Sequence, residues 1–236
     1  MRTFYPLFFA ALVIASTSCA PSYVLNNVNA PLLYQKKDYM AGANLNGQGL
    51  GLQGAYATTD HLGVMANVLV NPFGSDTKYY FGEVGGGYYT TIGDNVHFEL
   101  YGGTGWGYGK ATGEGLWSDD EISEEGSYWR IFAQPDIGFH SKYFELALAG
   151  RLVHVQYLDF KSDGMPAPNP DSWILEPSLV MRFGFGGQGF FENKKLFLQL
   201  TAETEVFGVP EFDTPVLNLG IGIIYRNRGY DNNFIN

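Results

Sequence analysis

Cys19 is the only cysteine in the sequence, and its position predicts a covalent modification. It follows an apolar run over residues 7–15 and three small residues, and a single charge precedes it. This order is typical of a secretory signal, and the run is too short to cross a bilayer, which takes about 20 residues. We predict a lipoprotein-type signal peptide over residues 1–18 and a lipidated Cys19. Because a strict lipobox has leucine where Ser16 stands, ordinary cleavage near Ala20 stays open as the alternative.

Candidates for catalysis are few. The sequence contains four histidines, His61, His97, His140 and His154. They lack the paired spacing of a zinc site, and no CxxC is present. A barrel-wall lipid hydrolase could combine His154 with Ser162 or Ser172 from the adjacent loop. A GxGxxG at residues 184–189 opens onto FFENKK rather than onto a helix, so it predicts a turn. We predict a protein that is not an enzyme and has no metal or cofactor.

Charged side chains recur on one face of segments in which polar and apolar residues alternate. A strand points successive side chains to opposite faces, so these charges share one side of a sheet. If the apolar side meets lipid, the charges line a barrel interior, where they must pair or be solvated. The predicted lumen charge network contains Glu83, Glu99, Arg130, Asp136, Glu145, Arg151, Glu176, Arg182, Glu203, Glu205 and Arg226. It predicts a plugged lumen, with a selective pore as the alternative.

The alternation predicts ten strands. We place them at 39–46, 49–58, 61–70, 78–90, 95–109, 127–139, 142–158, 173–185, 194–207 and 215–227. Many of them exceed the typical length of about 5–6 residues and suit a tilted membrane crossing of about 9–11. After the first hairpin, short and long links alternate, which is typical of periplasmic turns and outer loops.

The predicted fold is all-β, an antiparallel up-and-down transmembrane β-barrel of about ten strands, with eight as the alternative. The expected organisation is a signal peptide at 1–18, a periplasmic tether at 19–37, the barrel at 38–228 and a periplasmic tail at 229–236. An even number of strands starts and ends on one side of the membrane, so we expect the N-terminus in the periplasm.

Composition agrees with a membrane barrel. Charged residues make up 16% of the chain, against about 25% in ordinary globular domains. Removing residues 1–18 removes one arginine and no acid, which changes the net charge from −10 to −11 and disfavours nucleic acid as a partner. We expect outer-membrane lipid as a partner, and other envelope proteins at the outer loops 110–127 and 159–172. The acid-rich stretch 117–125 is expected to be a solvated loop.

Two segments resemble a group of small Bacteroidota outer-membrane-type β-barrel lipoproteins: SCAPSYV at 18–24 and AYATTDHLGVMANVLV at 55–70. The resemblance implies an envelope protein of the outer membrane and implies no activity. Our hypothesis is an outer-membrane barrel with a structural or interaction role. The alternatives are a narrow channel for small solutes or ions, a lipocalin-like periplasmic binding barrel with an apolar interior, and the lipid hydrolase.

Overall fold

The computed structural model describes residues 23, 25, 27–71, 78–93, 95–114, 121–141, 143–185, 194–204 and 218–227. Ten strands form its barrel: β1 (Tyr39–Asn46), β2 (Gly49–Ala57), β3 (Leu62–Val70), β4 (Lys78–Ile92), β5 (Val96–Glu114), β6 (Glu121–His140), β7 (Phe144–Tyr157), β10 (Asp171–Phe185), β11 (Lys194–Glu203) and β12 (Asn218–Asn227). Two short strands, β8 (Lys161–Ser162) and β9 (Met165–Pro166), form a hairpin beside β6. No helix in the described part of the chain is long and apolar enough to span a membrane.

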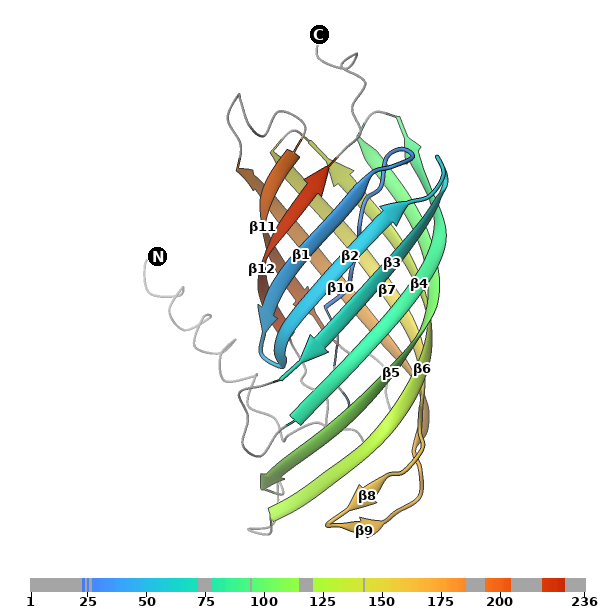
Figure 1. Ribbon diagram of the computed structural model, residues 1–236, viewed down its shortest axis with the longest axis vertical. Helices are drawn as coiled ribbons and strands as arrows, with labels where there is room; N and C mark the ends of the chain where they lie inside the picture. Colours follow the sequence, from blue (N-terminus) through green and yellow to red (C-terminus); the bar gives the residue numbers. More distant parts are fainter. Residues whose placement is uncertain are drawn as a thin grey trace, which may run out of the picture.

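The barrel is closed and antiparallel. Each of its strands pairs with the barrel strand that precedes it and the one that follows it, and β1 pairs with β12 to complete the ring (Figure 1). The predicted up-and-down barrel of ten strands is therefore confirmed. Closure leaves the barrel wall without a free edge over its paired length, which removes the unpaired backbone groups that an open sheet would present.

The two ends of the barrel differ in their links. At the end where β1 begins and β12 ends, three short links join consecutive strands, at residues 58–61, 93–95 and 141–143. A longer link, over residues 186–193, joins β10 to β11 at the same end. We call this the short-turn end. The opposite long-link end carries the connections between β3 and β4, β5 and β6, and β7 and β10, together with the tight turn between β1 and β2.

Strands β5 and β6 extend further than the sequence predicted. They contain 19 and 20 residues, and residues 111–114 pair with residues 121–124 beyond the first residue of β4 (Figure 1). The expectation of a solvated loop over 117–125 is thus wrong for its second half, because β6 begins at Glu121. The acid-rich composition of residues 121–125 is typical of a loop, so the sequence did not predict that they pair with the last residues of β5.

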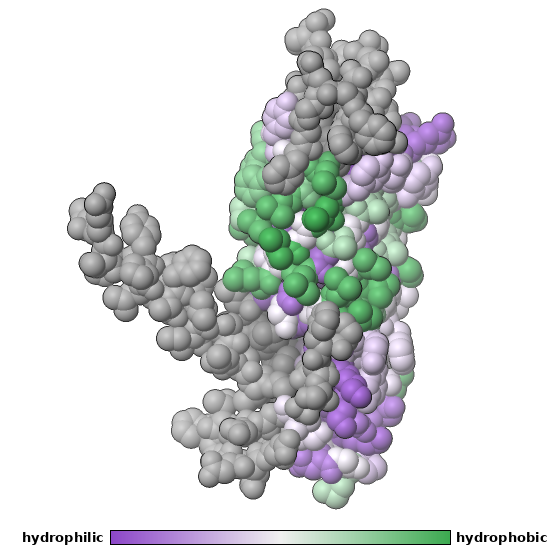
Figure 2. Space-filling view, turned by 60° about the vertical axis from the view of Figure 1, so that its left-hand side comes forward, coloured by the Kyte–Doolittle hydropathy of each residue, from purple (hydrophilic) through white to green (hydrophobic). Residues whose placement is uncertain are grey.

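The exterior of the barrel wall is apolar, and its inner positions carry charge. In β7, Leu148 and Leu152 are 55% and 44% exposed, while Arg151 is fully buried. In β12, Leu219 is exposed and the adjacent Asn218 is buried. Figure 2 shows apolar side chains over the middle of one face and hydrophilic side chains nearer its ends. The described strands do not have the reverse arrangement that a lipocalin-like binding barrel requires.

The apolar exterior leads to a prediction about Val84, which lies near the middle of β4 and is 59% exposed. Replacing Val84 with Arg places a charge where the wall would face hydrocarbon. We expect Val84→Arg to destabilise the protein folded in phospholipid vesicles, reducing its free energy of unfolding by about 2–4 kcal/mol. Urea titration of vesicle-inserted protein measures this loss.

Met165→Arg is the matched control, because Met165 is 67% exposed in β9, outside the barrel wall. It should change the folding free energy by less than about 0.5 kcal/mol, as most surface substitutions do. Equal losses for the two variants would contradict a lipid-facing position for Val84.

Candidate functional site: a charged lumen and the segment inside it

The charged residues predicted to line the lumen lie at buried positions of the wall. Ten of them are described, and each exposes 4% or less of its surface. These are Glu83, Glu99, Arg130, Asp136, Glu145, Arg151, Glu176, Arg182, Glu203 and Arg226. Glu205 and Cys19, which were also predicted as site residues, lie outside the described residues.

Residues 27–34, which we call the lumen segment, run through the interior of the barrel (Figure 1). Residues 27–33 are buried, as are Tyr23 and Leu25. The sequence predicts that residues 19–37 form a tether in the periplasm. This prediction does not hold for residues 27–33, which lie inside the barrel. The segment forms no strand, and its burial depends on wall residues that are distant in sequence, so the local pattern of residues does not reveal it.

Carboxylates of the wall accept hydrogen bonds from the backbone of the lumen segment. The amide of Val28 donates to Glu203 at 2.5 Å. The amides of Leu32 and Leu33 donate to the two oxygens of Glu99 at 2.9 and 2.8 Å. A buried amide without a partner costs about 1–3 kcal/mol, so these two carboxylates make the burial of the segment tolerable.

Guanidinium groups of the wall bind the carbonyl oxygens of the same segment. Arg182 Nη2 donates to the carbonyl of Ala30 at 2.8 Å. Arg226 donates to the carbonyls of Pro31 and Leu32 at 2.6 and 2.9 Å. Side chains of the wall therefore supply the hydrogen bonds that a neighbouring strand would supply to an extended backbone.

The lumen segment crosses the barrel from one end to the other. Leu33 binds Glu99, which lies near the start of β5 at the short-turn end. Asn27 accepts a hydrogen bond at 3.0 Å from Asn46, the last residue of β1 at the long-link end. The chain therefore approaches the long-link end as the residue number decreases.

Tyr23 continues this path towards the long-link end. Its hydroxyl donates to Glu176 Oε1 at 2.6 Å and accepts from Arg130 Nη1 at 2.6 Å. Its ring lies 5.7 Å from that of Tyr128, which in turn lies 5.2 Å from Tyr157. These three buried tyrosines form an aromatic layer across the lumen beyond the lumen segment.

Two arginines share two glutamates beside Tyr23. Arg130 Nη2 lies 2.5 Å from Glu83, and Arg151 Nη1 lies 3.4 Å from the same carboxylate. Both guanidinium groups are also 3.8 Å from Glu176. All four side chains are buried, so the attraction between their opposite charges offsets the cost of burying each of them.

A second cluster anchors the arginines that bind the lumen segment. Glu145 lies 3.1 Å from Arg182 and 3.0 Å from Arg226. His140 Nδ1 approaches the same carboxylate at 3.1 Å. Glu145 therefore fixes both guanidinium groups in the positions from which they reach the segment.

Glycines in the wall provide room for the segment. A Cβ at Gly138 would collide with the Leu32 side chain, and a Cβ at Gly63 would lie 2.6 Å from Leu33 Cδ1. Contacts this short are not tolerated without displacement of the leucine. The absence of a side chain at these two positions thus matches the shape of the segment.

The arrangement around His154 does not form a catalytic group. His154 lies on the outer side of the wall, with Nε2 2.6 Å from Asp171 and its ring 4.8 Å from that of Trp173. The hydroxyl of Ser172 donates to the carbonyl of Trp173, and Ser162 belongs to β8. Within the described residues, no group of three His, Cys, Asp or Glu side chains is placed to hold a metal ion.

Sequence reasoning missed the lumen segment itself. The one local signal was the order Asn-Val-Asn-Ala-Pro-Leu over residues 27–32, in which polar and apolar residues alternate briefly. This run resembles a short strand, but it pairs with none of the described strands, and a turn at residues 35–38 leads from it into β1. Its hydrogen-bond partners are distributed around the wall, in β1, β2, β3, β5, β6, β10, β11 and β12.

No protein-family model matches the sequence, and no curated protein matches it. Among solved structures, the chain is similar to the translocator domain of the autotransporter NalP from Neisseria meningitidis, with a TM-score of 0.50 and 10% identity over 81% of this chain and 88% of that chain. It also matches KdgM porin in complex with disordered oligogalacturonate, with a TM-score of 0.32 and 8% identity over 82% of this chain and 99% of that chain. A third match is OmpT, an outer membrane protein of Vibrio cholerae, with a TM-score of 0.21 and 12% identity over 80% of this chain and 96% of that chain.

The similarity to the translocator domain concerns the fold. Combined with the closed ring of ten strands and the apolar exterior, it defines the class of this protein: it has the fold of an outer-membrane β-barrel.

The role of Glu99 leads to a second prediction. Replacing Glu99 with Ala removes the acceptors of two buried amides, so we expect a loss of about 2–5 kcal/mol in the free energy of unfolding in detergent micelles. Glu125→Ala is the control, because Glu125 pairs with exposed lysines and should cost less than about 1 kcal/mol. Similar losses in the two variants would show that Glu99 does not hold the segment.

Proposed function

We propose that this protein is a non-enzymatic outer-membrane barrel with a structural or interaction role, whose lumen is plugged by its own lumen segment. The observation that carries the proposal is the series of hydrogen bonds between the segment and charged side chains of the wall, from Val28 to Leu33. A segment held in this way occupies the route that a solute would need. The resemblance of residues 18–24 and 55–70 to small outer-membrane lipoproteins supports the same role.

The links support an orientation in the membrane. Outer-membrane barrels have short turns in the periplasm and long loops outside. The short-turn end of this barrel is accordingly assigned to the periplasm, and the long-link end to the outer side. The start of β1 and the end of β12 then lie in the periplasm, because a barrel with an even number of strands starts and ends on the same side.

The lumen segment changes the expected side of the N-terminus. It leads the chain from Lys36 near the short-turn end to Tyr23 beside Glu176, on the long-link side. Cys19 precedes Tyr23 by four residues. We therefore infer that a lipidated Cys19 is anchored in the outer leaflet, and that the earlier expectation of a periplasmic N-terminus applies only to the start of β1.

The projecting end of the barrel is the proposed surface for other envelope proteins. It includes the extensions of β5 and β6 and the hairpin β8–β9, within the outer loops 110–127 and 159–172 (Figure 1). Lys161 lies 3.0 Å from Glu125, and this hydrogen bond raises the pKa of Lys161. The amide of Ser123 donates to Asp163 at 3.0 Å. These contacts hold the hairpin against β6, so the described part of this surface has a defined shape before any partner binds.

The plug predicts low permeability. We expect liposomes that contain the full-length protein to swell no faster in a small sugar such as arabinose than protein-free liposomes. A variant that lacks residues 20–34 should accelerate swelling, because the wall charges would then line a hydrated lumen. Heat-modifiable gel mobility checks that this variant is folded.

Rapid swelling with the full-length protein would contradict the plug and favour the alternative function, a narrow channel for small solutes or ions. This outcome does not depend on the deletion variant.

The threading of the chain predicts which residues are accessible from outside. In a Cys19→Ser background, Ser22→Cys should react with a membrane-impermeant maleimide in intact cells, since Tyr23 lies towards the long-link end. Lys36→Cys, at the short-turn end, is the matched control and should react only after the outer membrane is permeabilised. Labelling of Lys36→Cys but not of Ser22→Cys in intact cells would contradict the proposed orientation.

A further inference from the structure

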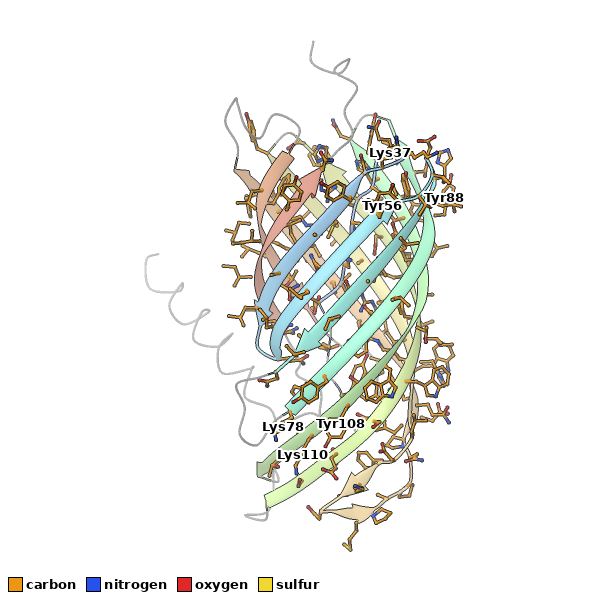
Figure 3. The ribbon with its side chains drawn as sticks, viewed as in Figure 1. Lys37, Tyr56, Lys78, Tyr88, Tyr108 and Lys110 are labelled. Carbon is orange, nitrogen blue, oxygen red and sulfur yellow. The ribbon has the colours of Figure 1, made fainter. Side chains whose placement is uncertain are left out.

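Two lysines lie directly opposite each other on the outer wall near the long-link end. Lys78 of β4 pairs in register with Lys110 of β5, and both point away from the lumen (Figure 3). Lys78 is exposed, and the Lys110 side chain is 41% exposed. Like charges at directly opposed positions of two strands are destabilising, so this pair is costly unless an anion lies beside it.

In the described part of the chain, the acidic group that pairs with Lys110 is shared with other donors. Glu125 lies 3.6 Å from Lys110, but it also lies 3.0 Å from Lys161 and accepts a hydrogen bond from Tyr108 at 3.4 Å. The nearby Asp159 is bound by the amide of Ser127 at 2.6 Å. Among the described residues, Lys78 makes no ion pair. The two lysines thus have one described ion-pair partner between them, Glu125, in a chain whose net charge is −10.

Aromatic residues continue the wall from the lysine pair towards its middle. Tyr80 pairs in register with Tyr108, and Trp106 pairs with Trp129. Tyr80 and Trp106 are 49% and 53% exposed. Tyrosine and tryptophan are typical of the interface between lipid headgroups and hydrocarbon. The lysine pair thus lies at the height at which headgroups of the outer leaflet would meet the wall.

We propose that Lys78 and Lys110 bind the phosphate of an anionic lipid headgroup in the outer leaflet. The acyl chains of that lipid would lie along the aromatic and apolar wall below the pair, which favours a lipid over free phosphate. Lys161 adds positive charge next to Glu125. This site rests on the proposed function, because it requires the wall to span a membrane.

A binding assay tests the lysine pair. Full-length protein in a neutral detergent is titrated with bisphosphorylated lipid A, and the bound fraction is measured by native mass spectrometry. We expect the combined Lys78→Gln and Lys110→Gln variant to bind on the order of tenfold more weakly than the wild type, because each lysine near a membrane surface contributes measurably to anionic lipid binding. Lys37→Gln is the control, because Lys37 is exposed at the opposite end of the barrel, and it should bind as the wild type does (Figure 3).

A second variant separates binding from stability. Lys78→Glu places a carboxylate opposite Lys110, so it should raise thermal stability in neutral detergent while it weakens binding of the lipid. A residue with a purely structural role would not produce these opposite changes. Unchanged lipid binding in both lysine variants would overturn the proposal, as would full competition by inorganic phosphate at the lipid concentration.

Failure of this site and failure of the proposed function give different results. If the wild type inserts into neutral vesicles but has no preference for the phosphorylated lipid, only the lysine site is wrong. If the wild type does not insert into vesicles at all, the membrane placement is wrong, and the lysine site is wrong with it.

Discussion

A backbone that runs through a closed barrel has no strand to pair with, because every strand of the wall already pairs with two neighbours. Its amides and carbonyls must find side chains, since a buried backbone group without a partner is costly. In this protein Glu99 and Glu203 accept the amides, and Arg182 and Arg226 donate to the carbonyls. The position of residues 27–34 depends on these contacts.

The wall depends on the segment in return. Glu99 makes no ion pair among the described residues, so the amides of Leu32 and Leu33 are the groups that stabilise its burial. Arg182 divides its donors between Glu145 and the carbonyl of Ala30. Removing the segment would leave these polar groups without partners unless water replaced it. The segment and the inner face of the wall are therefore one structural unit.

Local alternation was sufficient to predict the barrel and the side of the wall on which each charge lies. Arg151 and Leu152 are neighbours in sequence, and their opposite exposures follow from strand geometry alone. The same reasoning could not find the lumen segment, because Leu32 and Glu99 are 67 positions apart and no strand register connects them. It also ended β5 too early and began β6 too late, since the missed residues 110–114 and 121–126 are mostly polar or acidic and resemble a loop.

The strand count alone does not fix the side of the N-terminus, because the lumen segment precedes β1. An even number of strands returns the barrel to the side on which it started, but a segment that passes back through the lumen crosses once more. The juxtaposition of Lys78 and Lys110 is likewise visible only when β4 and β5 are aligned.

Amide hydrogen exchange in the folded full-length protein tests the central claim most directly. If the wall carboxylates hold the lumen segment, the amides of Val28, Leu32 and Leu33 should be protected to the same degree as those in β12. The amide of Lys36, which binds Asp60 at an exposed position, should exchange much faster. Exchange of Val28, Leu32 and Leu33 at the rate of an unstructured peptide, while β12 stays protected, would contradict the account.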